Sequence, residues 1–137
     1  MEFIVKKYYN IEGMIRNGFK LSRDYHSLDF SYAKISDDAM LALAKSRSVK
    51  QVRRLIITGK KLTAISAQAL AESNCLPNLE SLKLYKNKIG DEGVKYLAET
   101  DKLPNIKTFR FAWNDIGPEG ARSLAESSQL GGLTSLA

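Results

Sequence analysis

The stretch LESLKLYKNKIGDEGVKYLAETDKLPN, residues 79–105, is followed directly by IKTFRFAWNDIGPEGARSLAESSQLGG, residues 106–132. The two segments align without a gap, so the chain contains a unit of 27 residues. The same spacing continues outward from them, and equivalent units begin at Tyr25, Val52, Leu79, Ile106 and Leu133. Repetition at a fixed period of this size indicates a solenoid of stacked units.

Apolar residues recur at fixed positions in the unit, numbered as offsets from its first residue. Offsets three and five lie on one face of a β-strand, and offsets 14, 15, 18 and 19 have helical spacing. The offset-three residues are Leu28, Leu55, Leu82, Phe109 and Leu136, the offset-five residues are Phe30, Ile57, Leu84 and Phe111, and the offset-18 residues are Leu43, Leu70, Leu97 and Leu124. Each unit is predicted to be a short strand, a turn and a helix of about three turns.

The sequence also marks where the helices start. Pro118 is expected at a first helical position, where its missing N–H costs nothing, and acids such as Glu92 place negative charge at the positive end of a helix. Offset 11 holds residues that favour helix N-caps, namely Ser36, Thr63, Gly90 and Gly117. Offset 14 is small in every complete unit, namely Ala39, Ser66, Gly93 and Gly120. We expect these small residues to let the helix approach the sheet backbone closely.

These patterns predict an α/β fold, because one unit cannot bury both its strand face and its helix face, whereas stacked copies bury both. We expect a parallel sheet with right-handed crossovers, curved like a horseshoe, with strands on the concave side and helices on the convex side. Residues 1–24 are assigned to an N-terminal cap or degenerate repeat, in which Ile11, Met14 and Ile15 suit a degenerate helix. Residues 25–137 are assigned to the repeats, which start at 25, 52, 79, 106 and 133, the last incomplete.

Composition narrows the function classes. Hydrophobic residues make up 44% of the chain and charged residues 26%, which excludes disorder and a membrane protein. Cys75 is the single cysteine and His26 the single histidine, so no intramolecular disulfide can form, and a Cys/His-rich zinc site is excluded. No metal and no cofactor are expected. The net charge of +6 favours acidic partners.

Residues 79–132 resemble the ribonuclease-inhibitor subclass of leucine-rich repeats through the motif L-x-x-L-x-L-x-x-N-x-I followed by G-[DP]-E-G. The resemblance covers residues 25–137, and the LAES-type helix is similar to that of bacterial members, some of which resemble effectors delivered into host cells. It implies that the offset-eight asparagines, Asn87 and Asn114, bond neighbouring backbone groups. Ala33 and Lys60 replace this asparagine in the first two units.

The resemblance also implies that strand positions between core residues face the concave surface and bind partners. In the second to fourth units these offsets, one, two, four, six and seven, carry six positive charges against one negative, whereas the helix segments hold more acids than bases. The first unit differs, with His26, Ser27, Asp29, Ser31 and Tyr32. The candidate partner-binding residues are Arg54, Lys83, Tyr85, Lys86, Arg110 and Trp113. The leading prediction is a protein-binding module for an acidic partner.

Several alternatives stay open from the sequence. The charged strand face could simply be solvated, and Trp113 could pack on a neighbouring loop rather than a ligand. Basic and aromatic side chains also suit RNA or single-stranded DNA. Leu133 and Leu136 would lie near an uncovered end, so the sequence is truncated there or a second copy pairs with the edge strand to form a homodimer.

Catalysis is not expected. Neighbouring acids such as Asp37 with Asp38 belong to a first helical turn and are too exposed to work as an acid–base pair. His26 and Cys75 lack the partners of a nucleophilic site. The apolar run in the N-terminal segment MEFIVKK is too short for the core of a secretory signal, and no membrane role is expected. The expected location is the cytoplasm, or a host cytoplasm reached without a cleavable signal.

Overall fold

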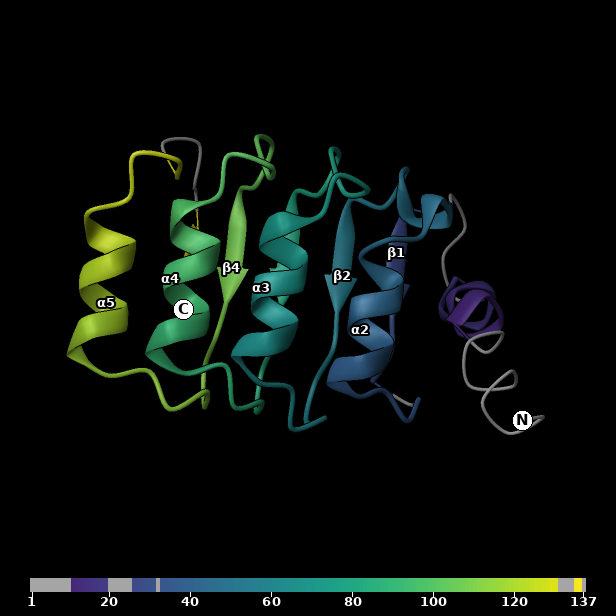
Figure 1. Cartoon of the computed structure of the whole chain (residues 1–137), viewed down its shortest axis with the longest axis horizontal. Coiled ribbons are helices and arrows are strands. Elements are labelled where there is room, and N and C mark those ends of the chain that lie inside the picture. Colours follow the sequence, from purple (N-terminus) through teal and green to yellow (C-terminus); the bar gives the residue numbers. More distant parts are fainter. Residues whose placement is uncertain (1–10, 20–25, 32, 131–134, 137) are drawn as a thin grey trace.

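The computed structural model describes residues 11–19, 26–31, 33–130 and 135–136. In these ranges strands and helices alternate after a first helix over residues 11–18 (Figure 1). The elements are β1 (Ser27–Asp29), α2 (Asp37–Leu43), a 3-10 turn (Arg47–Val49), β2 (Arg54–Ile56), α3 (Ala64–Glu72), β3 (Ser81–Lys83), α4 (Gly90–Glu99), β4 (Thr108–Arg110), α5 (Pro118–Ala125) and β5 (Ser135–Leu136). The predicted strand, turn and helix of each complete unit are confirmed, but the helices have 7 to 10 residues, so α2 is shorter than the predicted three turns.

The described strands form one parallel sheet in the order β1-β2-β3-β4-β5. Leu28 lies opposite Leu55, Leu55 opposite Leu82, Leu82 opposite Phe109, and Phe109 opposite Leu136. Each pair is one period apart, so the offset-three residues are aligned across the whole sheet, as predicted. The segments that start at 52, 79 and 106 are therefore neighbouring strands, and the α/β repeat fold follows from the sequence period.

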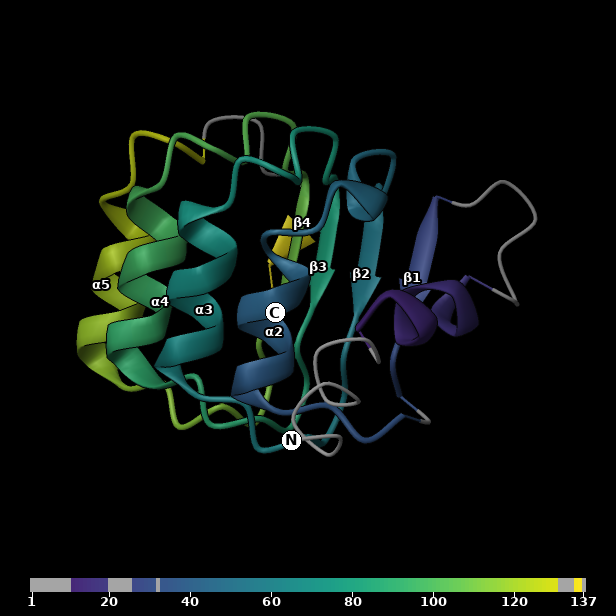
Figure 2. The same ribbon diagram turned by 45° about the vertical axis from the view of Figure 1, so that its right-hand side comes forward.

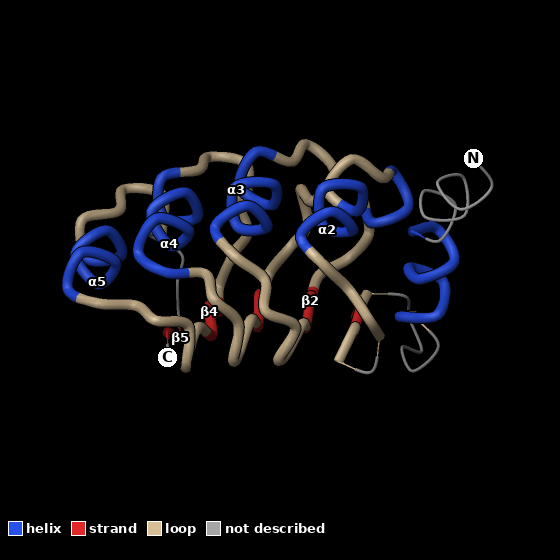
Figure 3. The backbone as a smooth tube through the Cα atoms, turned by 60° about the horizontal axis from the view of Figure 1, so that its bottom comes forward, coloured by secondary structure: helices blue, strands red, loops and turns tan. Residues whose placement is uncertain are grey.

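Helices α2 to α5 form a second layer against one face of the sheet (Figures 2 and 3). The core lies between the layers, where the offset-three and offset-five side chains of the four complete units are fully or almost fully buried. Phe109 and Phe111 stack with their ring centroids 5.0 Å apart. Burial of a large apolar side chain contributes about 1.5–3 kcal/mol, so the aligned apolar residues supply the main driving force for stacking.

Two details of the helices differ from the predictions. Gly90 is the first residue of α4 rather than its N-cap, and Ile89 precedes it without a side-chain cap. The small residue at offset 14 serves contact between helices, not contact with the sheet. A Cβ added to Gly93 would lie 2.5 Å from the Ile89 Cγ2 of the same coil, 3.1 Å from the Ala67 Cβ and 3.2 Å from the Ala64 Cα of α3. Helix α3 and the residue before α4, rather than the strand of the same coil, set this steric limit.

Two buried asparagines join adjacent coils at the carboxyl ends of the strands. The Asn87 Oδ1 accepts hydrogen bonds from the N–H groups of Lys60 at 2.9 Å and Leu62 at 3.1 Å, and its Nδ2 donates to the Ile57 carbonyl at 2.8 Å. Asn114 repeats the arrangement one coil later, since its Oδ1 accepts from the Ile89 N–H at 3.2 Å. These side chains satisfy backbone groups that burial would otherwise leave unpaired.

An aspartate from one coil caps the helix of the next coil in two places. Asp37 of α2 accepts hydrogen bonds from the Thr63 N–H at 3.0 Å, the Thr63 Oγ1 at 2.8 Å and the Ser66 Oγ at 2.5 Å. Asp91 of α4 accepts a bond of 2.7 Å from the Gly117 N–H at the start of α5. The sequence predicted that such acids act on their own helix, but these two act across the coil boundary.

Hydroxyl groups join the carboxyl ends of the helices in the same way. The Ser73 Oγ donates to the Ala44 carbonyl at 2.5 Å, Thr100 donates to the Ala71 carbonyl, and Ser127 donates to the Ala98 carbonyl. All three hydroxyls stand at offset 21. Since the last carbonyls of a helix have no partner within it, each coil completes the helix before it.

The helix over residues 11–18 lies at the first coil. Ile11, Ile15 and Phe19 are buried in the core, and Glu12 accepts hydrogen bonds from the hydroxyls of Ser46 at 2.6 Å and Ser48 at 2.5 Å. Ser46 is the offset-21 hydroxyl of the first unit, so Glu12 stands where later coils offer a helix carbonyl. The assignment of residues 1–24 as a cap stays a prediction, because residues 1–10 and 20–24 lie outside the described ranges.

Asn87→Ala is expected to lower the free energy of unfolding by about 3 kcal/mol, because it leaves several buried backbone groups without partners at about 1–3 kcal/mol each. Urea denaturation followed by circular dichroism measures the change. Asn17→Ala is the control, since Asn17 is an exposed helical residue. Equal unfolding midpoints for the two variants would contradict a role of Asn87 in joining the coils.

The capping by Asp37 predicts a dependence of stability on pH. Burial acts most strongly on Asp37 and raises its pKa, but the hydrogen bonds from Ser66 and Thr63 together outweigh burial and hold the pKa below its usual value. A carboxyl whose pKa is lower in the folded state stabilises the fold above its unfolded pKa of about 4, and this contribution disappears as the pH falls through the folded pKa.

Asp37→Asn should therefore destabilise the protein more at pH 7 than at pH 3, as measured by thermal unfolding at both values. Glu92→Gln is the matched control, because Glu92 is an exposed acid in the first turn of α4. A loss of melting temperature in Asp37→Asn that is the same at both pH values would show that the charge of Asp37 does not act across the coil boundary.

Candidate functional site

The predicted basic residues of the strands lie on the sheet face away from the helices. In each of β1, β3 and β4 the middle residue is buried towards the helices and its two neighbours are half-buried on the other face. Lys83 and Arg110 are partners in the β3–β4 register, so their side chains start from adjacent positions. Arg54 lies on the neighbouring strand β2, and its Nε donates a hydrogen bond of 2.5 Å to the Ser27 Oγ. The structure thus places these three side chains on one surface.

Part of the positive charge on this face is neutralised by Glu80. Its carboxylate lies 3.6 Å from the Arg53 Nε and 3.7 Å from the Lys107 Nζ. These surface ion pairs contribute at most about 1 kcal/mol each to stability, but they cancel charge locally. Among the described residues, Lys83 and Arg110 have no carboxylate within ion-pair distance. The net positive charge of the strand face is therefore centred on Lys83 and Arg110.

The predicted aromatic residues follow the carboxyl ends of β3 and β4. Tyr85 is half-buried, whereas Trp113 is 73% exposed. The Lys86 Nζ lies 4.7 Å from the centre of the Trp113 ring, a cation–π contact between neighbouring coils. Trp113 therefore contacts a neighbouring loop, the alternative raised by the sequence, while most of its surface is accessible to a ligand. Tyr32 lies outside the described residues.

The loops between strand ends and helix starts form an edge of the molecule, at the bottom of Figure 1, that sequence reasoning did not single out. We call this region the loop edge; its basic and aromatic residues are Lys34, Lys60, Lys61, Lys86, Lys88 and Trp113. Two shallow hollows lie along it and share Lys61. The signal was present in the sequence, because Lys34, Lys61 and Lys88 all occupy offset nine.

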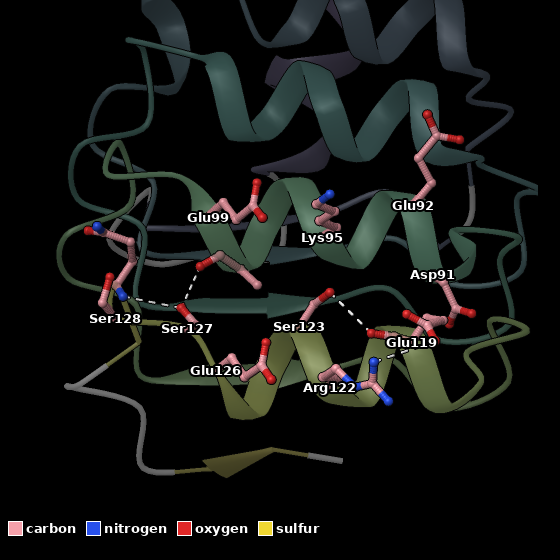
Figure 4. A pocket seen from close by; sticks show the side chains of 12 residues that line it. Asp91, Glu92, Lys95, Glu99, Glu119, Arg122, Ser123, Glu126, Ser127 and Ser128 are labelled. Atoms are coloured by element: carbon pink, nitrogen blue, oxygen red, sulfur yellow. Dashed lines mark hydrogen bonds and ion pairs between the residues drawn. The ribbon is translucent and has the colours of Figure 1, made fainter.

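The helix side carries the opposite charge. A hollow between α4 and α5 is lined by five acids and two bases (Figure 4). The acids are Asp91, Glu92, Glu99, Glu119 and Glu126, and the bases are Lys95 and Arg122. Arg122 lies 3.9 Å from Glu119 on the same helix. The sheet face and the loop edge are therefore basic, whereas this part of the helix layer is acidic.

Features of other site classes are absent from the described part of the chain. No three His, Cys, Asp or Glu side chains in these ranges are grouped so that they could hold a metal ion. Cys75 is a half-buried thiol in the loop before β3. None of the described helices combines the length and apolar character that crossing a bilayer requires.

Comparison with known families agrees with the geometry. A family model described as "Leucine Rich repeat" matches residues 26–44, 75–98 and 102–125. A search of curated proteins found no match. Leucine-rich repeats generally mediate protein–protein interaction and are typically non-enzymatic binding modules. The matched segments coincide with the first, third and fourth coils of the described structure, and the second coil, β2 with α3, lies in register between them. The three matches, together with the parallel sheet of 27-residue coils, support a leucine-rich repeat protein.

Proposed function

We propose that this protein is an interaction module that binds an acidic protein partner on the sheet face, centred on Lys83 and Arg110. The observation that carries the proposal is the placement of these two bases side by side in the β3–β4 register, with no described carboxylate to neutralise them. Arg54, Tyr85, Lys86 and Trp113 extend this surface. An acidic partner would gain attraction here and repulsion from the helix side, so charge would orient it.

The shape of the surface is part of the proposal. Strands in a sheet lie about 4.8 Å apart, whereas packed helices need about 8–10 Å. A stack of strand–helix units relieves this difference by curving towards the sheet. We therefore propose that the sheet lines the concave wall of a horseshoe and surrounds the partner.

The repeat subclass, the origin and the cellular compartment of the protein are proposed from sequence features alone. The motif at residues 79–95 and the 27-residue period favour the ribonuclease-inhibitor-like subclass. The LAES-type helices favour a bacterial origin, and a bacterial effector delivered into host cells is one such protein. A single cysteine suits a reducing compartment, either the cytoplasm of the source cell or that of a host.

The charge-reversed variant Lys83→Glu with Arg110→Glu tests the function. Trp113 is the single tryptophan, so its fluorescence reports binding next to Lys86. Titration with poly-glutamate should change the emission of the parent protein, and the variant should bind about tenfold more weakly, because two attractions become repulsions.

The matched control is Arg47→Glu with Lys95→Glu, two exposed bases outside the strands. It changes the net charge equally and should bind like the parent protein. Equal weakening in both variants would mean that only total charge matters, and the proposed site would be wrong. Stronger binding of a single-stranded oligonucleotide than of poly-glutamate would instead favour the nucleic-acid alternative.

Self-association is a second candidate, because α5 is less covered than the helices before it. Leu97 and Ala98 of α4 are fully buried, whereas the equivalent Leu124 is half-buried and Ala125 is exposed. A second copy that pairs along β5 would cover this surface. Sedimentation velocity should then show a dimer at high concentration, and Ala125→Glu should return it to a monomer. A monomer at all concentrations would contradict this candidate.

A further inference from the structure

Three exposed lysines stand at the same position of three successive coils. Lys34, Lys61 and Lys88 all occupy offset nine, and the loops that carry them continue the parallel pairing of the strands, since Thr63 and Lys88 form a parallel bridge. Lys88 also donates its N–H to the Leu62 carbonyl at 2.6 Å. The three lysines therefore stand on adjacent coils, whose strands are separated by roughly 4.8 Å. No described carboxylate pairs with any of them.

The backbone conformation of the loop edge points to a role beyond the turn for Lys61, Lys86 and Trp113. Four non-glycine residues in the described ranges have positive φ, and all four lie on the loop edge, namely Lys61 (φ 58), Lys86 (φ 56), Trp113 (φ 62) and Asp115 (φ 57). This conformation favours glycine, asparagine and aspartate, and Gly59 occupies it at the offset of Lys86 and Trp113. Lysine and tryptophan gain nothing from the turn itself, and such outliers cluster at functional positions.

We propose that the loop edge binds an extended acidic peptide that runs across the coils, with its acids on Lys34, Lys61 and Lys88 and an apolar residue on Trp113. This rests on the proposed function of protein binding and adds a second surface and a partner motif. Alternate side chains of an extended chain are about 6.7 Å apart, so three alternating acids span about 13 Å. The strands that precede the outer two lysines are about 10 Å apart, and the long, flexible lysine side chains can spread to meet these acids.

The fourth coil explains why a peptide fits better than a nucleic acid. At offset nine the lysines give way to Asp115, which would repel a continuing run of phosphates. The exposed Trp113 ring lies in the same hollow as Asp115. A peptide whose acids end at the third coil and are followed by an apolar side chain matches this change, whereas a uniformly charged backbone does not.

The test uses a short synthetic peptide in which glutamate alternates with serine three times before two leucines, and the same peptide with glutamine for glutamate. The full chain is titrated while Trp113 emission is recorded. The glutamate peptide should bind at least about tenfold more tightly than the glutamine peptide. Lys34→Glu with Lys61→Glu and Lys88→Glu should remove this preference, and the milder Lys→Gln triple variant should reduce it, with unchanged circular dichroism.

Lys83→Glu with Arg110→Glu separates this inference from the proposed function. If it leaves binding of the glutamate peptide intact while the lysine-column variant abolishes it, the inference is supported. If only the strand-face variant loses binding, the inference fails and the strand-face proposal stands. Failure of the unaltered protein to prefer the glutamate peptide, or tighter binding of a single-stranded oligonucleotide of similar length, would overturn the inference.

Discussion

Hydrogen bonds that run from one coil to the next are the constraint on which this structure depends. Asn87, Asp37 and Ser73 each bond a group 25 to 30 residues away, at the strand end, the helix start and the helix end respectively. Burial of these polar groups is tolerable only with a partner. Each of the three has partners in the adjacent coil, and Asn87 also donates to the Leu84 and Tyr85 carbonyls of its own coil. A coil with an extra residue would move its donors out of register with its neighbour, which explains why the period is constant.

The same constraint acts on the ends of the stack. Next to the first described coil, the helix over residues 11–18 supplies apolar side chains to the core and the carboxylate of Glu12 as a hydrogen-bond acceptor. Hydrogen bonds from Ser46 and Ser48 lower the pKa of Glu12, so the charged form is favoured at neutral pH. At the other end, Ile116, Leu124 and Leu130 pack against the core with part of their surface exposed.

The strand and helix of every complete unit could be predicted because burial repeats the same residue type at the same offset. The second coil shows that a few apolar residues at the right offsets are enough to place a coil in the stack. The family model does not match residues 52–74, yet Leu55, Ile57 and Leu70 are buried in register with the other coils. Contacts between coils were harder to foresee. The space around Gly93 and the reach of Asp37 depend on the distance between helices, which no single unit encodes.

Sequence reasoning treated the whole strand face as the binding surface because it counted charges without their partners. Glu80 neutralises much of the positive charge of Arg53 and Lys107, whereas no described carboxylate neutralises the charges of Lys83 and Arg110. The offset-nine lysines of the loop edge, Lys34, Lys61 and Lys88, were missed because they lie beyond the strands, where the family pattern expects turns. Lys86 and Trp113, which sequence reasoning did select, belong to the loop edge and touch each other. A stable interface covers about 800 Å² on each partner, an area that the site proposed on the strand face could share with the loop edge around Trp113.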